Sequence, residues 1–208
     1  MKIYESHDAP NPRRVRIFLA EKGLQISFEQ VDITNAVNRG EEFRRKNSLA
    51  TVPVLELDNG TCICESVAIC RYFEEIHPQP ALFGSGPEQR ALVEMWNRRI
   101  EFNLLQPIAD TFRQRHDFFK GRIRQLPEYA QVQRLNAEDA LAWLDRELAG
   151  RSFVAGDQFS IADITGLVAI DFGRVSKIAI NGRVNHVSQP AFSRCAIWRS
   201  IECTRRLM

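Results

Sequence analysis

The feature that most constrains the fold is a change of pattern at residues 77–88. This segment, "HPQPALFGSGPE", contains three prolines and two glycines. Proline and glycine at this density are typical of a connecting loop, because neither residue suits the interior of a helix or strand. Short strand-like and helix-like runs alternate before the segment, whereas only helical periodicity follows it. The sequence therefore predicts two domains, residues 1–77 and 89–208, joined by a linker at 78–88.

Residues 1–77 predict a small α+β domain. Short runs of alternating apolar residues bounded by turns are typical of strands, and apolar residues three or four apart are typical of helices. The predicted order is β-α-β-α-β-β-α, with strands at 2–6, 26–31, 53–57 and 61–64 and helices at 12–22, 41–46 and 65–76.

Residues 89–208 predict an all-helical domain, which begins with one long helix over about 88–118. Four apolar residues recur along it at intervals of four: Trp96, Ile100, Leu104 and Ile108. This spacing places them on one stripe of a helix. Pro107 should kink the helix, because its ring excludes a backbone hydrogen bond.

Further helices are expected at 127–149, after residue 160 and, more weakly, at 190–206. The start after residue 160 has the clearest signal, since Ser160 is a preferred N-cap and Asp163 stands three residues later. A carboxylate at that spacing can accept a hydrogen bond from the N-cap backbone.

Composition excludes several classes of function. The net charge is +2, from 28 Lys and Arg against 26 Asp and Glu, which disfavours nucleic acid as the main partner. No run reaches about 18 apolar residues, so we expect no membrane span. The start of the chain leads directly into a strand-like pattern, so we expect no signal peptide. Five cysteines favour a reduced, cytoplasmic setting, and the four scattered histidines predict no metal site.

The turn before the first helix reads "APNPRRVR". Asn11 suits the N-cap position and Pro12 suits the first helical position. A helix N-terminus carries unpaired N–H groups and about half a positive charge, to which nearby arginines add. Such an end attracts anions, including a thiolate. The alternative is that Asn11 is only a cap and that the arginines face solvent.

Two later motifs add binding potential. Pro53 follows the β-branched Val52, and a cis bond there would leave the Val52 backbone free to pair with a peptide-like ligand. Glu65 and Ser66 open another helix, whose N–H groups and hydroxyl could hold a carboxylate, while Glu65 could bind an amine or set the local charge. The simpler interpretations are a proline at a strand edge and an ordinary cap pair.

Together these motifs resemble the glutathione transferase superfamily, most closely its bacterial members. The resemblance rests on "SHDAPNPRRVRIFLAEKG", on "TVPVL" followed by "NGTCICESVAICRYFEE", and on "FVAGDQFSIADI", and it spans nearly the whole chain. It implies a thioredoxin-like glutathione-binding domain followed by a helical domain. It also implies a homodimer that uses glutathione as co-substrate against a hydrophobic electrophile.

The resemblance implies roles for individual residues. Val52 would pair through its backbone with the cysteinyl part of glutathione, beside the cis-proline Pro53. Glu65 and Ser66 would bind the γ-glutamyl group, and Asp163 would be a structural cap. The second substrate would lie against the first long helix of the helical domain. Its candidate contacts are two aromatic residues that core packing explains equally well: Phe102 and Phe112.

The chain departs from the family at two positions. Ala9 stands where many members have Ser or Cys, so no side chain there can bind the thiolate. Asn11 then becomes the candidate catalytic residue, with Ser6 and Tyr4 as alternatives, although Tyr4 also fits the core. Ala50 replaces the usual polar residue for the glycine carboxylate. Four basic residues could substitute: Arg39, Arg44, Arg45 and Lys46.

Three functions remain open at this stage. A transferase would conjugate the glutathione thiolate to an electrophilic carbon. A glutathione-dependent disulfide reductase would need no protein hydroxyl and so accommodates Ala9. A binding protein that has lost its chemistry would accommodate both Ala9 and Ala50. Cys62 and Cys64 are two apart rather than three, which predicts core or half-buried free thiols and not a redox dithiol.

Overall fold

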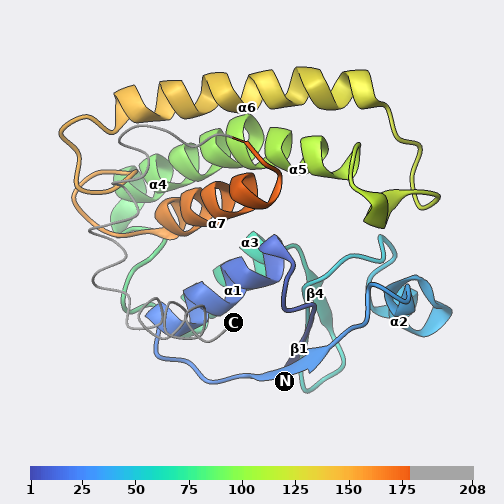
Figure 1. Ribbon diagram of the computed structural model, residues 1–208. Coiled ribbons are helices and arrows are strands. Elements are labelled where there is room, and N and C mark those ends of the chain that lie inside the picture. The colour runs from blue at the N-terminus through green and yellow to red at the C-terminus, as the bar shows by residue number, and fades with distance from the viewer. Residues whose placement is uncertain (179–208) are drawn as a thin grey trace, which may run out of the picture. The chain divides into compact units, whose positions relative to one another are not determined.

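The computed structural model describes residues 1–178 and divides the chain into two compact units (Figure 1). The first unit is Met1–Leu82 and the second is Phe83–Met208, so the division falls inside the segment predicted as a linker. The helix predicted at 190–206 lies outside the described residues. Within residues 1–178, none of the helices combines the length and apolar character that crossing a membrane requires.

The first unit has the predicted order of strands and helices, with one added short helix, η1. The elements are β1 (Lys2–Glu5), α1 (Pro10–Glu21), β2 (Ser27–Gln30), η1 (Val37–Arg39), α2 (Glu41–Lys46), β3 (Val54–Glu56), β4 (Cys62–Cys64) and α3 (Ser66–Ile76). The α+β class predicted for this part of the chain is therefore confirmed.

The four strands form one mixed sheet in the order β2-β1-β3-β4. β1 is parallel to β2 and antiparallel to β3, with Tyr4 opposite Val54 and Ile3 opposite Leu55. Successive side chains of a strand point to opposite faces. Tyr4 and Val54 therefore share one face, where they pack with Phe43 of α2. α1 and α3 pack against each other on the other side (Figure 1).

One prediction for the first unit is wrong: Asn11 is not the N-cap of α1. The helix begins at Pro10, and Ala9 takes the N-cap position without a side-chain hydrogen bond. The fixed φ of proline suits the first turn of a helix, where its missing N–H has no partner to lose. Pro10 and Pro12 both satisfy that rule, and the helix starts at the earlier one. Asn11 is consequently the second helical residue.

The second unit is helical throughout its described part. It contains α4 (Gly86–Ile100), the π-helical segment η2 (Glu101–Leu105), α5 (Gln106–Arg113), the short helix η3 (Asp117–Phe119), α6 (Pro127–Glu147) and α7 (Ile161–Val175). The predicted long helix is present as the run α4-η2-α5, which ends at Arg113 rather than near residue 118. Its irregularity lies before Pro107, as a π turn that accommodates the missing backbone hydrogen bond. The predicted stripe is buried at all four positions: Trp96, Ile100, Leu104 and Ile108.

The start of α7 confirms the predicted capping box. Ser160 and Asp163 satisfy each other reciprocally, and the Asp163 carboxylate also accepts a hydrogen bond from the backbone N–H of Val154 at 2.8 Å. The carboxylate is 5% exposed. Burial raises the pKa of Asp163 to about 6, against the opposing effect of its hydrogen bonds. The residue is a structural cap inside the second unit.

Candidate functional site

Arg14 connects the candidate residues of α1 and α3. Its guanidinium lies inside the first unit, where the residue is 1% exposed. Nη1 donates a hydrogen bond to Ser66 Oγ at 2.6 Å and another to Asn11 Oδ1 at 3.3 Å. The sequence suggested Arg14 only as one of three positive charges near the helix start. The structure instead places its charge between two of the predicted site residues.

The sequence contained a signal for this position that the prediction did not use. Arg14 precedes the buried Phe18 by four residues, which is about one helical turn. Residues four apart lie on the same face of a helix, so Arg14 belongs to the apolar, inward face of α1. A charged residue on such a face needs hydrogen-bonding partners inside the protein.

The contact with Arg14 fixes how the Asn11 amide is used. Asn11 is half-buried, and its Oδ1 accepts the hydrogen bond from Arg14. The other end of the amide, Nδ2, can only donate. Within residues 1–178 Nδ2 makes no hydrogen bond, so the side chain offers a donor beside the N-terminus of α1.

Glu65 and Ser66 form the N-terminus of α3. Ser66 is the first helical residue and is 4% exposed, and its hydroxyl accepts the hydrogen bond from Arg14. Glu65 is exposed and has a φ of 65°, a left-handed conformation that is costly for a residue with a side chain. No side chain caps the helix. The first N–H groups of α3 therefore lie near a buried guanidinium, an arrangement that favours an anion.

Val52 and Pro53 lie directly before β3. Their peptide bond is cis, which agrees with the cis-proline that the resemblance implies. Pro53 is buried and Val52 is half-buried. In the described part of the chain, the N–H and C=O of Val52 make no hydrogen bond. Both backbone groups are available to an extended ligand.

Tyr4 belongs to the core, as one of its two interpretations predicted. It is 6% exposed, and its hydroxyl donates to Glu56 Oε2 at 2.6 Å on the sheet face covered by α2. Lys46 reaches the same carboxylate oxygen at 2.9 Å. The hydrogen bond from Tyr4, followed by that from Lys46, lowers the pKa of Glu56. The hydroxyl of Tyr4 is thus already engaged, away from α1 and α3.

The basic residues proposed for the glycine carboxylate also have partners. Lys46 pairs with Glu56, and Arg45 pairs with Glu41 at 2.9 Å on the exposed surface of α2. The Nε of Arg44 donates to the backbone carbonyl of Arg39 at 2.9 Å. These contacts mainly organise α2 and the segments that flank it.

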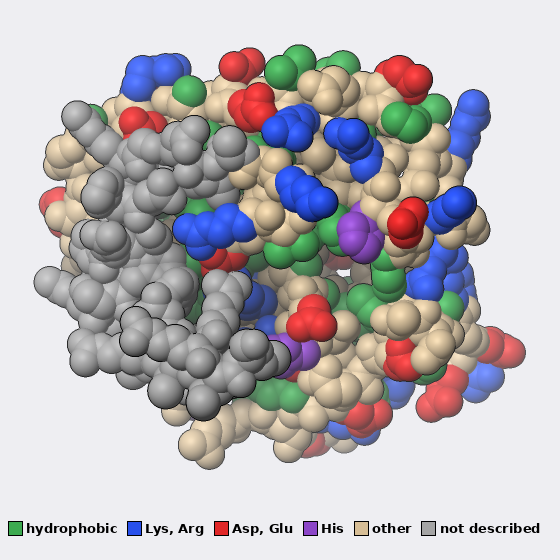
Figure 2. All heavy atoms as spheres, viewed as in Figure 1, with side chains coloured by type: hydrophobic (Ala, Val, Ile, Leu, Met, Phe, Trp, Pro, Cys, Tyr) green, Lys and Arg blue, Asp and Glu red, His purple; other side chains and the backbone are tan. Residues whose placement is uncertain are grey.

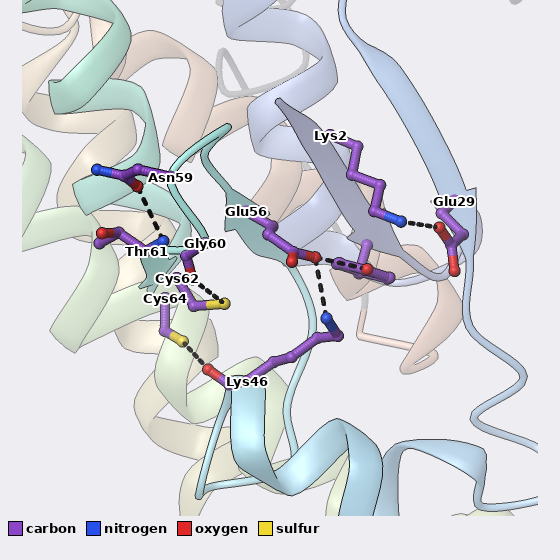
Figure 3. Close-up of polar contacts among 10 residues, drawn as sticks. Lys2, Glu29, Lys46, Glu56, Asn59, Gly60, Thr61, Cys62 and Cys64 are labelled. Carbon is purple, nitrogen blue, oxygen red and sulfur yellow. Dashed lines mark hydrogen bonds and ion pairs between the residues drawn. The ribbon is translucent and has the colours of Figure 1, made fainter.

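The cysteines of β4 are free and half-buried, as predicted. The Cys64 thiol lies 3.6 Å from the backbone oxygen of Lys46 (Figure 3). Burial, and to a smaller extent Cys62 and Glu65, raise the pKa of Cys64. A raised pKa keeps the thiol protonated at neutral pH and therefore unreactive.

Phe102 and Phe112 have different surroundings within the second unit. Phe102 belongs to η2, is 61% exposed and lines a groove of about 820 Å³ together with Trp143 of α6. Phe112 lies near the end of α5 and is half-buried among other rings, with its centroid 5.1 Å from that of Phe172. The two candidates therefore face different parts of the helical unit.

Comparison with known proteins follows the same division of the chain. A family model described as "Glutathione S-transferase, N-terminal domain" matches residues 3–81. Another, described as "Glutathione S-transferase, C-terminal domain", matches residues 95–169.

Similar proteins cover most of the chain. Glutathione S-transferase 2 of Saccharomyces cerevisiae is 36% identical over 187 residues, which are 86% of this chain and 79% of the yeast protein. The crystal structure of a glutathione S-transferase domain-containing protein from Marinobacter aquaeolei VT8 is 37% identical, with a TM-score of 0.87 over 94% of this chain and 98% of that chain. The crystal structure of Gtt2 from Saccharomyces cerevisiae is 32% identical, with a TM-score of 0.85 over 97% of this chain and 96% of that chain.

Proposed function

Because the chain belongs to the glutathione S-transferase superfamily, we propose that it conjugates glutathione to an electrophilic carbon of a hydrophobic substrate. In this reaction the thiol of glutathione loses its proton to solvent. The thiolate then forms a C–S bond while the leaving group departs with its bonding electron pair. The protein lowers the thiol pKa and positions the two reactants.

In the proposed site, glutathione binds along the first unit. The backbone N–H and C=O of Val52 pair with its cysteinyl part beside the cis-proline Pro53. The N-terminus of α3, with Glu65 and Ser66, holds the γ-glutamyl group. The free N–H groups of α3 and the nearby guanidinium of Arg14 favour its carboxylate, and the exposed Glu65 favours its amine.

The observation that carries the proposal is the orientation of the Asn11 amide. Oδ1 is held by Arg14, so the free Nδ2 donates to the thiolate. A donor stabilises the ionised sulfur and lowers the thiol pKa. A hydrogen bond to a charged group contributes about 1.5–3 kcal/mol, which corresponds to about tenfold to a hundredfold in thiolate formation.

Two substitutions at Asn11 test this role. Asn11→Ala removes the donor, and we expect the pKa of enzyme-bound glutathione to rise by about 1–2 units. Asn11→Asp keeps an acceptor for Arg14 but places a second negative charge near the sulfur. An acidic residue in the first turn favours the helix, so Asn11→Asp should fold normally and lose more activity than Asn11→Ala.

The ionisation of bound glutathione is measured by the ultraviolet absorbance of the thiolate as a function of pH. The rate of conjugation is measured separately with an aryl halide. Gln131→Ala, which removes an exposed side-chain amide from α6, is the matched control. If Asn11→Asp keeps both the thiolate pKa and the turnover of the unaltered protein, Asn11 has no part in the reaction.

Ala9 supports a second candidate, glutathione-dependent disulfide reduction. The N-cap of α1 has no hydroxyl or thiol, and reduction of a disulfide by glutathione needs none from the protein. Turnover of a model disulfide is therefore measured beside that of the aryl halide. A protein that binds immobilised glutathione and turns over neither compound would be a binding protein.

We further propose a cytoplasmic homodimer. Apolar side chains exposed on the helical unit support an interface there: Leu92, Phe102, Val132 and Leu135. The three described cysteines, Cys62, Cys64 and Cys70, are all free, which fits a reducing compartment.

A further inference from the structure

The segment after α5 concentrates positive charge. Residues 113–124, "RQRHDFFKGRIR", contain five Lys and Arg and one Asp, which leave a net charge of +4. The whole chain has a net charge of only +2, so the rest of it sums to −2. Without these twelve residues of the second unit, the net charge of the chain would be negative.

Several of these cations have no partner among residues 1–178. Arg113 pairs with Asp110 at 3.3 Å. By contrast, Arg115, Lys120 and Arg124 are exposed, and none of them forms an ion pair with a residue of the described chain. Figure 2 shows Lys and Arg side chains gathered on the upper part of its view. Unpaired cations close together in sequence attract an anionic ligand.

Four aromatic rings lie in the same region. Phe112 of α5, Phe118 and Phe119 of η3 and Phe172 of α7 are all half-buried rather than enclosed. The ring centroids of Phe112 and Phe119 are 5.9 Å apart, those of Phe112 and Phe172 are 5.1 Å apart, and those of Phe118 and Phe119 are 4.9 Å apart. His116 stacks on Phe112 with a centroid distance of 4.3 Å, and the Arg122 guanidinium lies 4.2 Å from the centre of the Phe118 ring. The half-buried cluster offers a planar apolar group the ring surface that these two contacts leave.

The segment that carries these groups is held by its own hydrogen bonds. Gln125 Nε2 donates to the backbone carbonyls of Arg113 at 2.9 Å and His116 at 3.0 Å. The N–H of Leu126 donates to Gln114 Oε1 at 2.8 Å. The backbone that carries the rings and cations is thus held before any ligand arrives, which lowers the entropic cost of binding.

We propose that the second substrate is an aromatic compound that carries a negative charge, such as an aryl carboxylate or sulfonate. Its ring packs on the aromatic cluster, and its anionic group faces Arg115 and Lys120. The inference rests on the proposed transferase function and on Phe112 as a contact of the second substrate. The charge of the rest of the chain, −2, disfavours a long polyanion, which needs an extended positive track.

The test uses two electrophiles that share a reacting carbon. 4-Chloro-3-nitrobenzoate and 4-chloro-3-nitrobenzamide differ in charge but have nearly the same shape. The ratio of their kcat/KM values is compared between the unaltered protein and Arg115→Gln/Lys120→Gln. The two compounds differ in intrinsic reactivity by the same factor in every protein, so this factor cancels when the ratios are compared. Arg90→Gln/Arg146→Gln removes the same charge from exposed positions elsewhere in the second unit and is the matched control.

We expect the benzoate-to-benzamide ratio to fall about fivefold in Arg115→Gln/Lys120→Gln, the size expected for exposed charge pairs. The control should keep the ratio of the unaltered protein. Added salt should lower the ratio in the unaltered protein and have less effect in the variant. A ratio that is the same in all three proteins would overturn the inference.

Equilibrium binding of the same two compounds, measured by calorimetry without glutathione, separates this inference from the proposed function. Tighter binding of the benzoate that depends on Arg115 and Lys120 supports the inference even if neither compound is turned over, an outcome that counts against transferase activity alone. Failure of both compounds to bind overturns it. Tighter binding of a single-stranded oligonucleotide than of the benzoate would also overturn it, in favour of a nucleic acid.

Discussion

The hydrogen bond between Arg14 and Ser66 should contribute measurably to the stability of the first unit. It joins α1 to α3 across 52 residues of sequence, with a distance of 2.6 Å between Nη1 and Oγ. Arg14 is 1% exposed and Ser66 is 4% exposed. Ser66→Ala removes the acceptor and leaves the guanidinium buried.

The expected cost follows from the charge of the donor. A hydrogen bond to a charged group contributes about 1.5–3 kcal/mol, against about 1 kcal/mol for a neutral pair. Because Arg14 keeps its contact with Asn11, we expect Ser66→Ala to lower the free energy of unfolding by about 2 kcal/mol. For a chain of this length, such a change lowers Tm by about 4–8 °C.

The assay is urea unfolding of the full chain without glutathione, because Ser66 is also a proposed glutathione contact and a bound ligand would add its own stabilisation. Ser27→Ala is the matched control, since Ser27 is exposed on β2 and its hydroxyl makes no hydrogen bond with the described residues. The control should change stability by less than about 0.5 kcal/mol. If the two variants lose the same amount, the contact between Arg14 and Ser66 does not stabilise the fold as the structure implies.

Two further predictions concern the second unit. Burial raises the pKa of Asp163 to about 6, above its value of about 3.9 in an unfolded chain. The folded chain therefore binds this proton more tightly, so the contribution of Asp163 to the free energy of unfolding is present below about pH 4 and is lost as the pH rises to about 6. Urea unfolding should show the stability advantage of the unaltered protein over Asp163→Asn shrinking by about 3 kcal/mol across that range, and a constant difference would refute the assignment. Phe102→Asp should weaken the proposed dimer by about a hundredfold or more in sedimentation experiments, because each subunit loses a ring that the proposed interface would bury. An intact dimer with a raised KM for the electrophile would place Phe102 at the substrate site instead.

Local signals predicted much of the fold. α2 spans Glu41–Lys46, as its composition indicated, and the pair of strands β3 and β4 follows from the tight turn between them. The capping box of Ser160 and Asp163 is a contact over three residues, so sequence alone determines it. In each case the deciding interaction is confined to one turn or one hairpin.

Local sequence preferences alone do not determine the start of α1. Pro10 and Pro12 are both allowed in the first turn, and no residue nearby distinguishes the two starts. Assigning the N-cap to Asn11 rested on its side-chain preference alone. In the structure Ala9 occupies that position, and the Asn11 amide bonds with Arg14 instead. A contact inside the fold therefore decides what Asn11 does.

The candidate site was predictable as a set of residues but not as a network. Asn11 and Ser66 were found separately, from helix starts 55 residues apart in the sequence. Arg14 joins them only because α1 and α3 pack together, a relation that helical periodicity does not contain. Similarly, the choice between the two interpretations of Tyr4 required the register that places it opposite Val54, facing α2.

The same network explains how the proposed chemistry can proceed past Ala9. A hydroxyl at that position could donate to a thiolate or accept from a thiol, so it would not discriminate between the two forms of glutathione by itself. The Asn11 amide has its oxygen engaged by Arg14, and its N–H₂ is the group without a partner in the described chain. A group restricted to donation favours the ionised sulfur over the protonated one. The buried guanidinium and the N-terminus of α1 add positive potential in the same place. In the proposed mechanism, Arg14 thus has a positioning role: it makes Asn11 a donor, and the donor replaces the missing hydroxyl.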